Sequence, residues 1–390
     1  MNIEPRQGTM RYLKAACALV CFLILVSNVW TISRWNESRG VYDDICYLRQ
    51  AHLFQKFGLG GLDTNIVRDD DHYLSSKLKE IGYAAWNDPA AAPCHNLMPA
   101  TQKRVMQYPP GTGFLLAMFP AGYQVIPLYV AANIIVFGFA SLGIFYANAR
   151  WLILLAGAVG CAAVYLMVNP AKASYSMPPT MVVCALAGFL TARLFGQPHP
   201  RLETVLTVLL GFVLGLSVDF RLPNVFLSSA YFLFFLVAFL SSRSMKLVLQ
   251  GALFTLAFLI GMAPTLIANA VNAGSPFATT YSGPDVVRPD FAPNVVWQYV
   301  TDVQFALLAF VGASTVFHLC VGCTRGIRRV ALMVTVNLLI NLAFFMSHPL
   351  FTTYYTIPIT MLSLWSLMFN WLMQPVETVD DGLLEQAAKL

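Results

Sequence analysis

The chain has 390 residues, of which 57% are hydrophobic and only 11% are charged. Soluble globular domains carry roughly a quarter charged residues, so this composition excludes an ordinary soluble protein and indicates an integral membrane protein. The formal net charge of +5 is modest, and the basic residues are scattered between apolar segments, which argues against a nucleic-acid partner.

Apolar segments follow one another along most of the chain. Residues 1–14 are polar and basic, and the apolar run after them is long enough to span a bilayer, so we expect a retained helix and no cleaved signal peptide. About ten segments approach the length that a spanning helix requires. They cover residues 13–32, 125–147, 150–168, 180–195, 204–219, 224–240, 246–267, 303–321, 329–346 and 353–372. The apolar patch 114–119 is too short to cross and predicts an interfacial or re-entrant segment.

Basic residues in the short connections predict the orientation. With the N-terminus in the cytoplasm, most of these arginines and lysines fall on the inner face, as the positive-inside rule requires. An even number of spans returns the tail, 373–390, to the cytoplasm. Two long segments then face the outside, a large first loop at 33–113 and a second loop at 267–302. The predicted fold is an all-α integral membrane protein, with one polytopic domain over residues 1–372.

Cysteines and glycines give two more local predictions. Most of the eight cysteines lie inside apolar spans, but Cys46 and Cys94 fall in the first loop. The sequence leaves a disulfide between these two open, since the bond requires an oxidising compartment. Gly211 and Gly215, four residues apart in one span, predict close packing against another helix of the same chain.

Charged residues gather at the predicted outer interface. No expected span has a charge near its middle, which argues against an ion-coupled transporter. Asp219 and Arg221 lie at one outer span end, where a simple anchoring ion pair is an alternative to a functional role. The acidic run at 69–71 has the ligand types for a divalent cation, but a solvated patch is the simpler interpretation. We therefore assign no metal site.

An acidic pair, Asp43 and Asp44, follows the first span. If residues 42–54 are helical, Asp44 shares a mostly apolar face with Tyr47 and Ala51, which is typical of an amphipathic helix on the membrane surface. Carboxylates in a first helical turn commonly cap the helix. A catalytic base is the alternative, and spacing alone leaves both open.

Two motifs carry a resemblance to a known family. Asp43-Asp44-Ile45-Cys46-Tyr47 resembles the first-loop signature of the GT-C glycosyltransferases. These membrane enzymes use polyprenyl-phosphate sugars and include the bacterial relatives of protein mannosyltransferases and the lipid A aminoarabinose transferase. The stretch 107–116, which contains Tyr108-Pro109-Pro110-Gly111, is similar to the family's aromatic-Pro-Pro stretch that leads back into the membrane.

Two shorter likenesses lie later in the chain. The segment 219–224 is similar to the family's arginine-containing turn at an outer span end, and 348–358 is similar to its aromatic and proline run. The chain departs from the family in having Asp-Asp where Asp-Glu is common. We also predict no soluble extracytoplasmic domain, so we expect loops alone to recognise the acceptor.

The resemblance implies an inverting glycosyltransferase of a bacterial inner membrane. It would move a sugar from a polyprenyl phosphate to a glycan, lipid or protein acceptor at the extracytoplasmic face. Membrane lipids would surround the protein, and the reaction would need no obligatory cofactor or metal. A carboxylate would act as general base and a cation would stabilise the departing phosphate. The implied catalytic residues are Asp43 and Asp44, and the implied substrate-binding residues are Tyr47, Tyr108, Arg221, Arg288, His348 and Tyr354. The alternative is a non-enzymatic multi-pass protein, such as a lipid-linked-sugar flippase or an assembly subunit of an envelope polysaccharide pathway.

Overall fold

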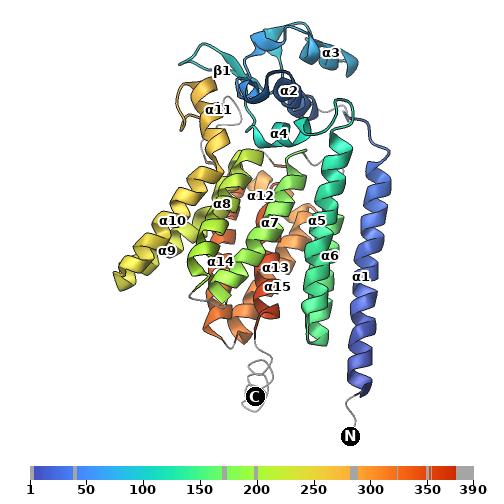
Figure 1. Ribbon diagram of the computed structural model, residues 1–390, viewed down its shortest axis with the longest axis vertical. Helices are drawn as coiled ribbons and strands as arrows, with labels where there is room; N and C mark the ends of the chain where they lie inside the picture. The colour runs from blue at the N-terminus through green and yellow to red at the C-terminus, as the bar shows by residue number, and fades with distance from the viewer. Residues whose placement is uncertain are drawn as a thin grey trace.

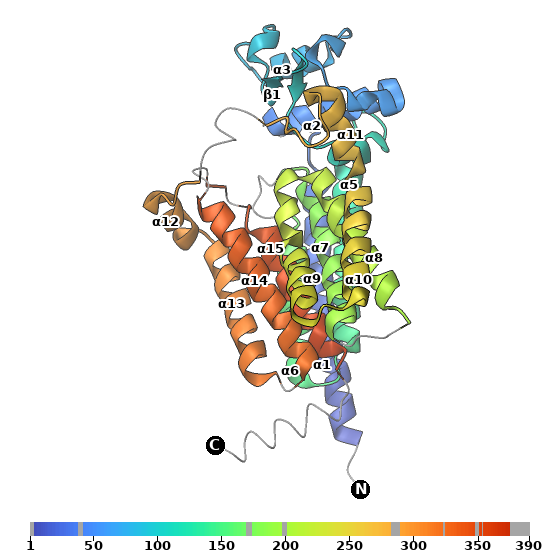
Figure 2. The same ribbon diagram turned by 90° about the vertical axis from the view of Figure 1, so that its left-hand side faces the viewer.

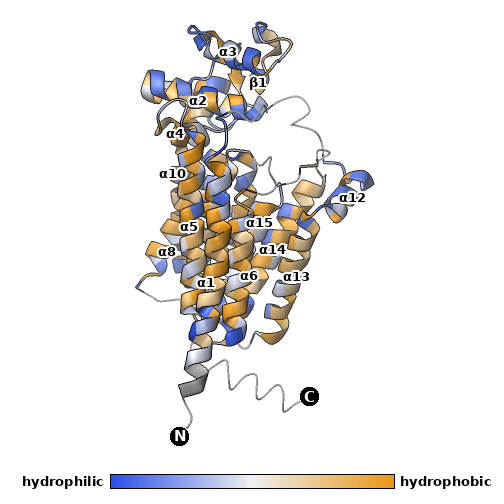
Figure 3. Cartoon of the chain, turned by 90° about the vertical axis from the view of Figure 1, so that its right-hand side faces the viewer, coloured by the Kyte–Doolittle hydropathy of each residue, from blue (hydrophilic) through white to orange (hydrophobic). Residues whose placement is uncertain are grey.

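The structure is a computed structural model in which a bundle of long helices carries a smaller cap at one end (Figures 1 and 2). Most residues of the bundle are hydrophobic, whereas the cap mixes hydrophobic and hydrophilic residues (Figure 3). The described residues are 4–37, 42–168, 174–196, 201–281, 289–322, 324–347, 351–352 and 354–374.

Long apolar helices make up the bundle. They are α1 (Glu4–Ile32), α5 (Val125–Tyr146), α6 (Arg150–Tyr165), α7 (Met177–Thr191) with a π-helical turn (Ala192–Gly196), α8 (Glu203–Phe220), α9 (Ser229–Ser242) after a 3-10 turn (Leu222–Ser228), α10 (Met245–Gly261), α13 (Gln304–Val321), α14 (Arg325–Ser347) and α15 (Ile357–Leu372). In the described part of the chain, seven helices are long and apolar enough to cross a membrane, or eight if the bent pair of α10 and α11 counts as one span. The chain is therefore a multi-pass α-helical membrane protein.

The predicted number of full spans, about ten, is too high by this measure. Each of the ten apolar segments contains a helix, but α6 and α15 have only 16 residues each. Such a helix is about 24 Å long, which is less than the ~30 Å of a hydrocarbon core. The predicted segments 150–168 and 353–372 were longer because apolar residues continue past the helix ends. Every residue of α15 is buried, so this helix is a core element that other helices surround.

A bend interrupts the predicted span 246–267. Helix α10 ends at Gly261, and α11 (Ala263–Ala273) leaves it at an angle of 56°. Pro264 has no N–H to donate to the carbonyl one turn earlier, which accounts for the break. The second half therefore leans into the cap, where the Asn272 side chain donates to the Leu62 carbonyl at 2.8 Å.

Close packing of α8 against α10 depends on two glycines. A Cβ atom at Gly211 or Gly215 would overlap the carbonyl oxygen of Phe254 or Phe258 on the neighbouring helix. Lipid removes most of the hydrophobic driving force between helices, so close backbone approach and dispersion contacts stabilise the pair instead. The predicted intramolecular packing of this pair is confirmed.

The cap is built from the first loop and α11. It contains α2 (Tyr42–Phe57), 3-10 turns (Gly58–Leu62, Ile66–Arg68 and Pro89–Ala91), α3 (Tyr73–Glu80), the strands β1 (His95–Leu97) and β2 (Arg104–Met106), and α4 (Gly111–Ala117). The antiparallel hairpin pairs His95 with Met106 and Leu97 with Arg104, a small departure from the all-α prediction. The short apolar patch forms α4 and does not cross the bundle. A separate helix, α12 (Pro293–Thr301), lies in the predicted second loop.

The start of α1 and the end of α15 lie at the same end of the bundle, opposite the cap (Figures 1 and 2). Basic residues gather there: Lys14 donates to the Phe145 carbonyl at 2.7 Å, and Lys246 pairs with Glu203 at 2.6 Å. The predicted tail, residues 373–390, lies almost wholly outside the described residues, which end at 374.

Candidate functional site

The acidic pair occupies the first turn of α2, where the helix dipole favours negative charge. Asp43 is half-buried, whereas Asp44 is only 1% exposed. The predicted surface position of this helix is wrong, because its residues 44–51 are all buried. Other parts of the cap, α3, the turn Gly58–Leu62 and α4, pack against α2, so the helix is enclosed by protein and presents no open amphipathic face.

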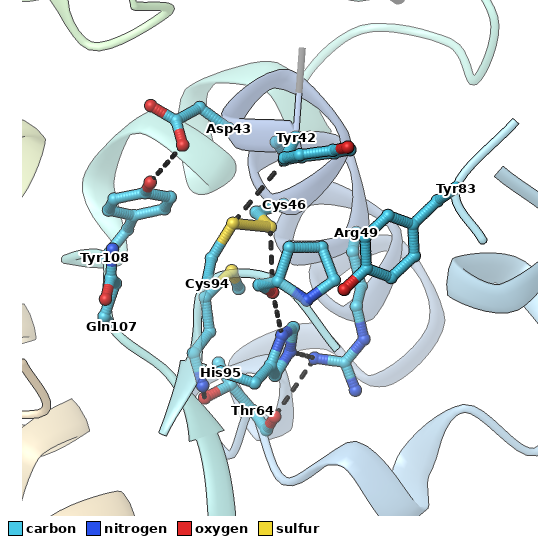
Figure 4. Close-up of a disulfide and its surroundings, with 12 residues drawn as sticks. Tyr42, Asp43, Cys46, Arg49, Thr64, Tyr83, Cys94, His95, Gln107 and Tyr108 are labelled. Carbon is cyan, nitrogen blue, oxygen red and sulfur yellow. Dashed lines mark hydrogen bonds between the residues drawn. A yellow bond between two sulfur atoms is a disulfide. The ribbon is translucent and has the colours of Figure 1, made fainter. Parts of the chain in front are cut away.

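Tyr108 joins the two predicted motifs. Its hydroxyl donates to Asp43 Oδ1 at 2.5 Å (Figure 4). Its ring stacks on that of Tyr47, with the centroids 4.7 Å apart. Close approach of α4 to α2 permits this contact, because a Cβ atom at Gly113 would overlap the Gln50 side chain. The two stretches are about 60 residues apart in sequence, and they meet at one carboxylate.

Burial keeps the phenols of this cluster protonated. It raises the pKa of Tyr47 to about 12, with the Asp43 charge adding to the rise, while the Ser174 and Ser176 hydroxyls and the Arg221 charge oppose it. Burial and the Asp43 charge also raise the pKa of Tyr108. Both tyrosines are therefore hydrogen-bond donors at neutral pH.

Arg221 lies directly after α8 and is 7% exposed. Its guanidinium lies 5.1 Å from the ring centroid of Tyr354 and 4.6 Å from that of Tyr355, and it donates to Met177 Sδ at 3.7 Å. Among the described residues it has no carboxylate partner. An enclosed cation is costly unless it is paired, so this position is suited to an anionic ligand.

The alternative of an anchoring ion pair between Asp219 and Arg221 is wrong. Asp219 Oδ1 instead accepts from the Thr265 backbone N–H at 3.0 Å and from its hydroxyl at 2.6 Å. Asp219 Oδ2 has no hydrogen-bond partner among the described residues. The carboxylate therefore caps the start of α11 and leaves Arg221 free.

The carboxylate and the guanidinium belong to one cluster. Burial is the largest cause of the raised pKa of Tyr354. Of the two charges that act on this phenol, Arg221 lowers the pKa and Asp43 raises it. Tyr47 also lies within the electrostatic reach of both charges. Tyr47 and Tyr354 are therefore each within electrostatic reach of an acid on the cap and of a cation at the end of the bundle.

A disulfide and a buried pair hold α2 from the side away from Tyr108. Cys46 and Cys94 form the disulfide that the sequence left open (Figure 4). Arg49 donates to His95 Nε2 at 3.0 Å and to the Thr64 carbonyl at 3.0 Å. Burial first, and then the Arg49 charge, lower the pKa of His95 to about 3.

His95 therefore has a structural role in the cap. It is only 5% exposed, and its neutral ring donates from Nδ1 to the Pro93 carbonyl while Nε2 accepts from Arg49. No spacing in the sequence marks this partnership, because the two residues are 46 positions apart.

The acidic run at 69–71 has structural partners. Asp69 accepts from the Leu74 backbone N–H at 2.7 Å and thus caps α3. Lys56 lies 2.6 Å from Asp70 and 3.0 Å from Asp71, and Asp71 also contacts His52. Within the described ranges, no group of three His, Cys, Asp or Glu side chains could hold a metal ion.

The structure brings most of the predicted site together. The residues of the cluster are Asp43, Tyr47, Tyr108, Arg221 and Tyr354, with Asp44 next to Asp43. Arg288 and His348 lie outside the described residues. Sequence analysis did not assign Met177, Tyr281 or Tyr355 to the site, although the Tyr354-Tyr355 pair was part of a weak motif. Tyr281 lies 6.3 Å from Tyr108 between ring centroids.

No family model matches this sequence, and comparisons with characterised proteins and with solved structures also return no match.

Proposed function

We propose that the chain is a GT-C-like glycosyltransferase, which moves a sugar from a polyprenyl phosphate carrier to an acceptor hydroxyl at the extracytoplasmic face of a membrane. One observation carries the proposal. A half-buried carboxylate, Asp43, contacts Tyr108, and an enclosed cation with no carboxylate partner among the described residues, Arg221, contacts Tyr354; both charges act on Tyr47 and Tyr354. The cluster lies where the bundle meets the cap, which is the level of a lipid headgroup.

The two charges suit the two ends of an inverting transfer. Asp43 takes the proton from the acceptor hydroxyl while the oxygen of that hydroxyl bonds to the anomeric carbon of the sugar. The bond from that carbon to the phosphate oxygen breaks at the same time, and the electron pair leaves with the phosphate. Arg221 stabilises this departing anion. Asp43 is the preferred base because Asp44 is almost completely enclosed.

The tyrosines hold the groups in place. Tyr108 donates to Asp43 and fixes the carboxylate rotamer, and Tyr47 supports the Tyr108 ring by stacking. Tyr354 lies beside the Arg221 guanidinium, so it limits where that cation points.

Two features support an extracytoplasmic cap. The Cys46–Cys94 disulfide belongs to an oxidising compartment. The basic residues at the opposite end of the bundle, including Lys14 and Lys246, fit a cytoplasmic face under the positive-inside rule. Both termini would then be cytoplasmic.

Transfer of radiolabelled sugar from a panel of polyprenyl-phosphate sugars tests the proposal. We expect Asp43→Asn to reduce the rate at least about 100-fold, the usual contribution of a general base, and Arg221→Gln to reduce it by a similar factor. Asp44→Asn decides between the two carboxylates. Asp71→Asn is the matched control, because this acid lies in the same cap but pairs with Lys56 and His52.

Two results would contradict the proposal. If no donor is consumed by the folded wild-type protein, the flippase or assembly-subunit alternative replaces the enzyme. If transfer occurs but Asp43→Asn, Asp44→Asn and Asp71→Asn all match wild type, the carboxylate assignment is wrong.

A further inference from the structure

A cavity lies in the cap, on the far side of α2 from Tyr108. Its volume is about 370 Å³, and it lies between α3 and the 3-10 turn at Pro89–Ala91. Leu74, Leu78 and Ala92 form an apolar floor, and all three are buried. The proposed transfer at Asp43 makes no use of this cavity.

Polar groups without partners surround this floor. The rim contains His72, Trp86 and Asn87, all of them exposed. Within the described part of the chain, none of their side chains makes a hydrogen bond. The imidazole, the indole N–H and the amide are therefore all available to a ligand.

Charges near the cavity do not favour an anionic ligand, because Asp69 and Asp88 line it and would repel an anion. Lys79 lies 4.9 Å from the Trp86 ring centroid, where its charge offsets part of the attraction of these acids for a cation. A neutral ligand that offers both hydroxyl groups and an apolar face fits these surroundings. A sugar ring has this character, because its C–H face packs on an aromatic ring while its hydroxyls bond to amide and imidazole groups.

The floor of the cavity touches the helix that carries the proposed base. Ile45, fully buried between Asp44 and Cys46, packs in one cluster with Leu74, Leu78 and Ala92. The disulfide at Cys46 fastens the same turn to the segment that follows the cavity wall. A ligand in the cavity would therefore lie across one helix from Asp43.

We propose that this cavity binds a neutral sugar unit of the acceptor, so that the acceptor is a glycan or a glycosylated molecule. The acceptor role of the bound sugar rests on the proposed transferase function, whereas sugar binding by itself does not. The sequence predicted that loops alone recognise the acceptor, and the cap, which the first loop forms, would then provide this recognition.

Binding of neutral saccharides to the full chain tests this inference. The protein is placed in lipid nanodiscs because detergents with sugar headgroups would compete for the site. The probes are methyl glycosides and short oligosaccharides of common neutral hexoses and pentoses, observed by saturation-transfer NMR. We expect saturable binding that Trp86→Ala weakens about tenfold or more, the effect of losing one aromatic anchor. Asn87→Ala, which removes no internal hydrogen bond, should weaken binding by a smaller factor. Trp297→Ala is the matched control, because that side chain is 66% exposed on α12.

The outcomes separate this inference from the proposed function. The sugar site is overturned if the wild-type protein binds no saccharide, or if Trp86→Ala and Asn87→Ala leave binding unchanged. This holds even if Asp43-dependent transfer is measured. Binding that depends on Trp86 supports the site, and Asp43→Asn should retain it. If such binding occurs but no donor is consumed, the transferase proposal fails and the sugar site stands.

Discussion

Different forces stabilise the bundle and the cap, because different solvents surround the two regions. In the bundle, α15 is buried on all sides, and glycines bring α8 and α10 into backbone contact. The cap has small apolar clusters around Ile45 and around Val105, and residues of α2 and α4 that join the bundle core, together with a disulfide and the buried Arg49–His95 contact. A region of this size in water buries too little apolar surface to be stable without such additional constraints.

This difference shows where each region is vulnerable. Lipid tails are as apolar as the helix surfaces, so the bundle depends on the shape of its contacts. The cap depends on a few specific bonds. A change of shape should therefore damage the bundle, and a loss of one bond should damage the cap. Four predictions test this contrast, in order of decreasing effect.

Removal of the disulfide should have the largest effect. The bond joins residues 48 positions apart, and closing such a loop stabilises a fold by about 4 kcal/mol in the chain-entropy account. We expect Cys46→Ser with Cys94→Ser to increase hydrogen exchange throughout the cap and to leave the bundle protected. Cys320→Ser, at an exposed free cysteine, is the control. Equal loss of protection in both regions would show that they unfold as one unit.

Filling a glycine contact should affect the bundle next. Gly215→Ala places a methyl group against the Phe258 carbonyl and should lower the stability by about 2–3 kcal/mol, a typical cost of overpacking. Thermal unfolding in detergent measures the change. Gly138→Ala on α5, where no atom lies within 4 Å, should be neutral or slightly stabilising. If both variants behave alike, close packing of α8 on α10 is not what stabilises this pair.

Acid should weaken the cap through His95. The folded-state pKa of about 3 lies below the unfolded value of about 6.5, so the neutral ring favours folding. This contribution is complete above pH 6.5 and is lost as the pH falls toward 3, with a slope of at most about 1.4 kcal/mol per pH unit. His95→Gln retains an acceptor for Arg49 but does not titrate, so its cap stability should depend less on pH. Parallel pH profiles would contradict this assignment.

A surface ion pair of the cap should have the smallest effect. Lys77 and Glu80 lie 2.7 Å apart at the end of α3, with 33% and 60% of their side chains exposed. Such pairs contribute at most about 0.5 kcal/mol, and salt screens them. Lys77→Ala should therefore leave the unfolding midpoint of the cap almost unchanged. A loss comparable to that of the disulfide variant would mean that exposed charges also stabilise the cap.

Local patterns predicted the elements of the site, but not their assembly. The acidic pair was expected at the start of a helix, which is confirmed, and Tyr108 lies just before the short helix α4, where the sequence predicted an interfacial or re-entrant segment. The hydrogen bond between Tyr108 and Asp43 was not predicted, because contacts between distant segments leave no periodic signal. The enclosure of α2 was missed for the same reason, since covering segments on both sides bury its polar residues too.

Hydrophobicity and charge placement along the sequence by themselves determined that this is a multi-pass helical membrane protein with a large polar first loop. These properties follow from the composition of each segment, because a bilayer selects apolar helices one at a time. Three features became visible only in the folded chain: α15 is a buried core helix, α10 and α11 bend apart, and Asp219 caps α11 rather than pairing with Arg221. Those outcomes depend on which segments become neighbours, and packing between distant parts of the chain sets that choice.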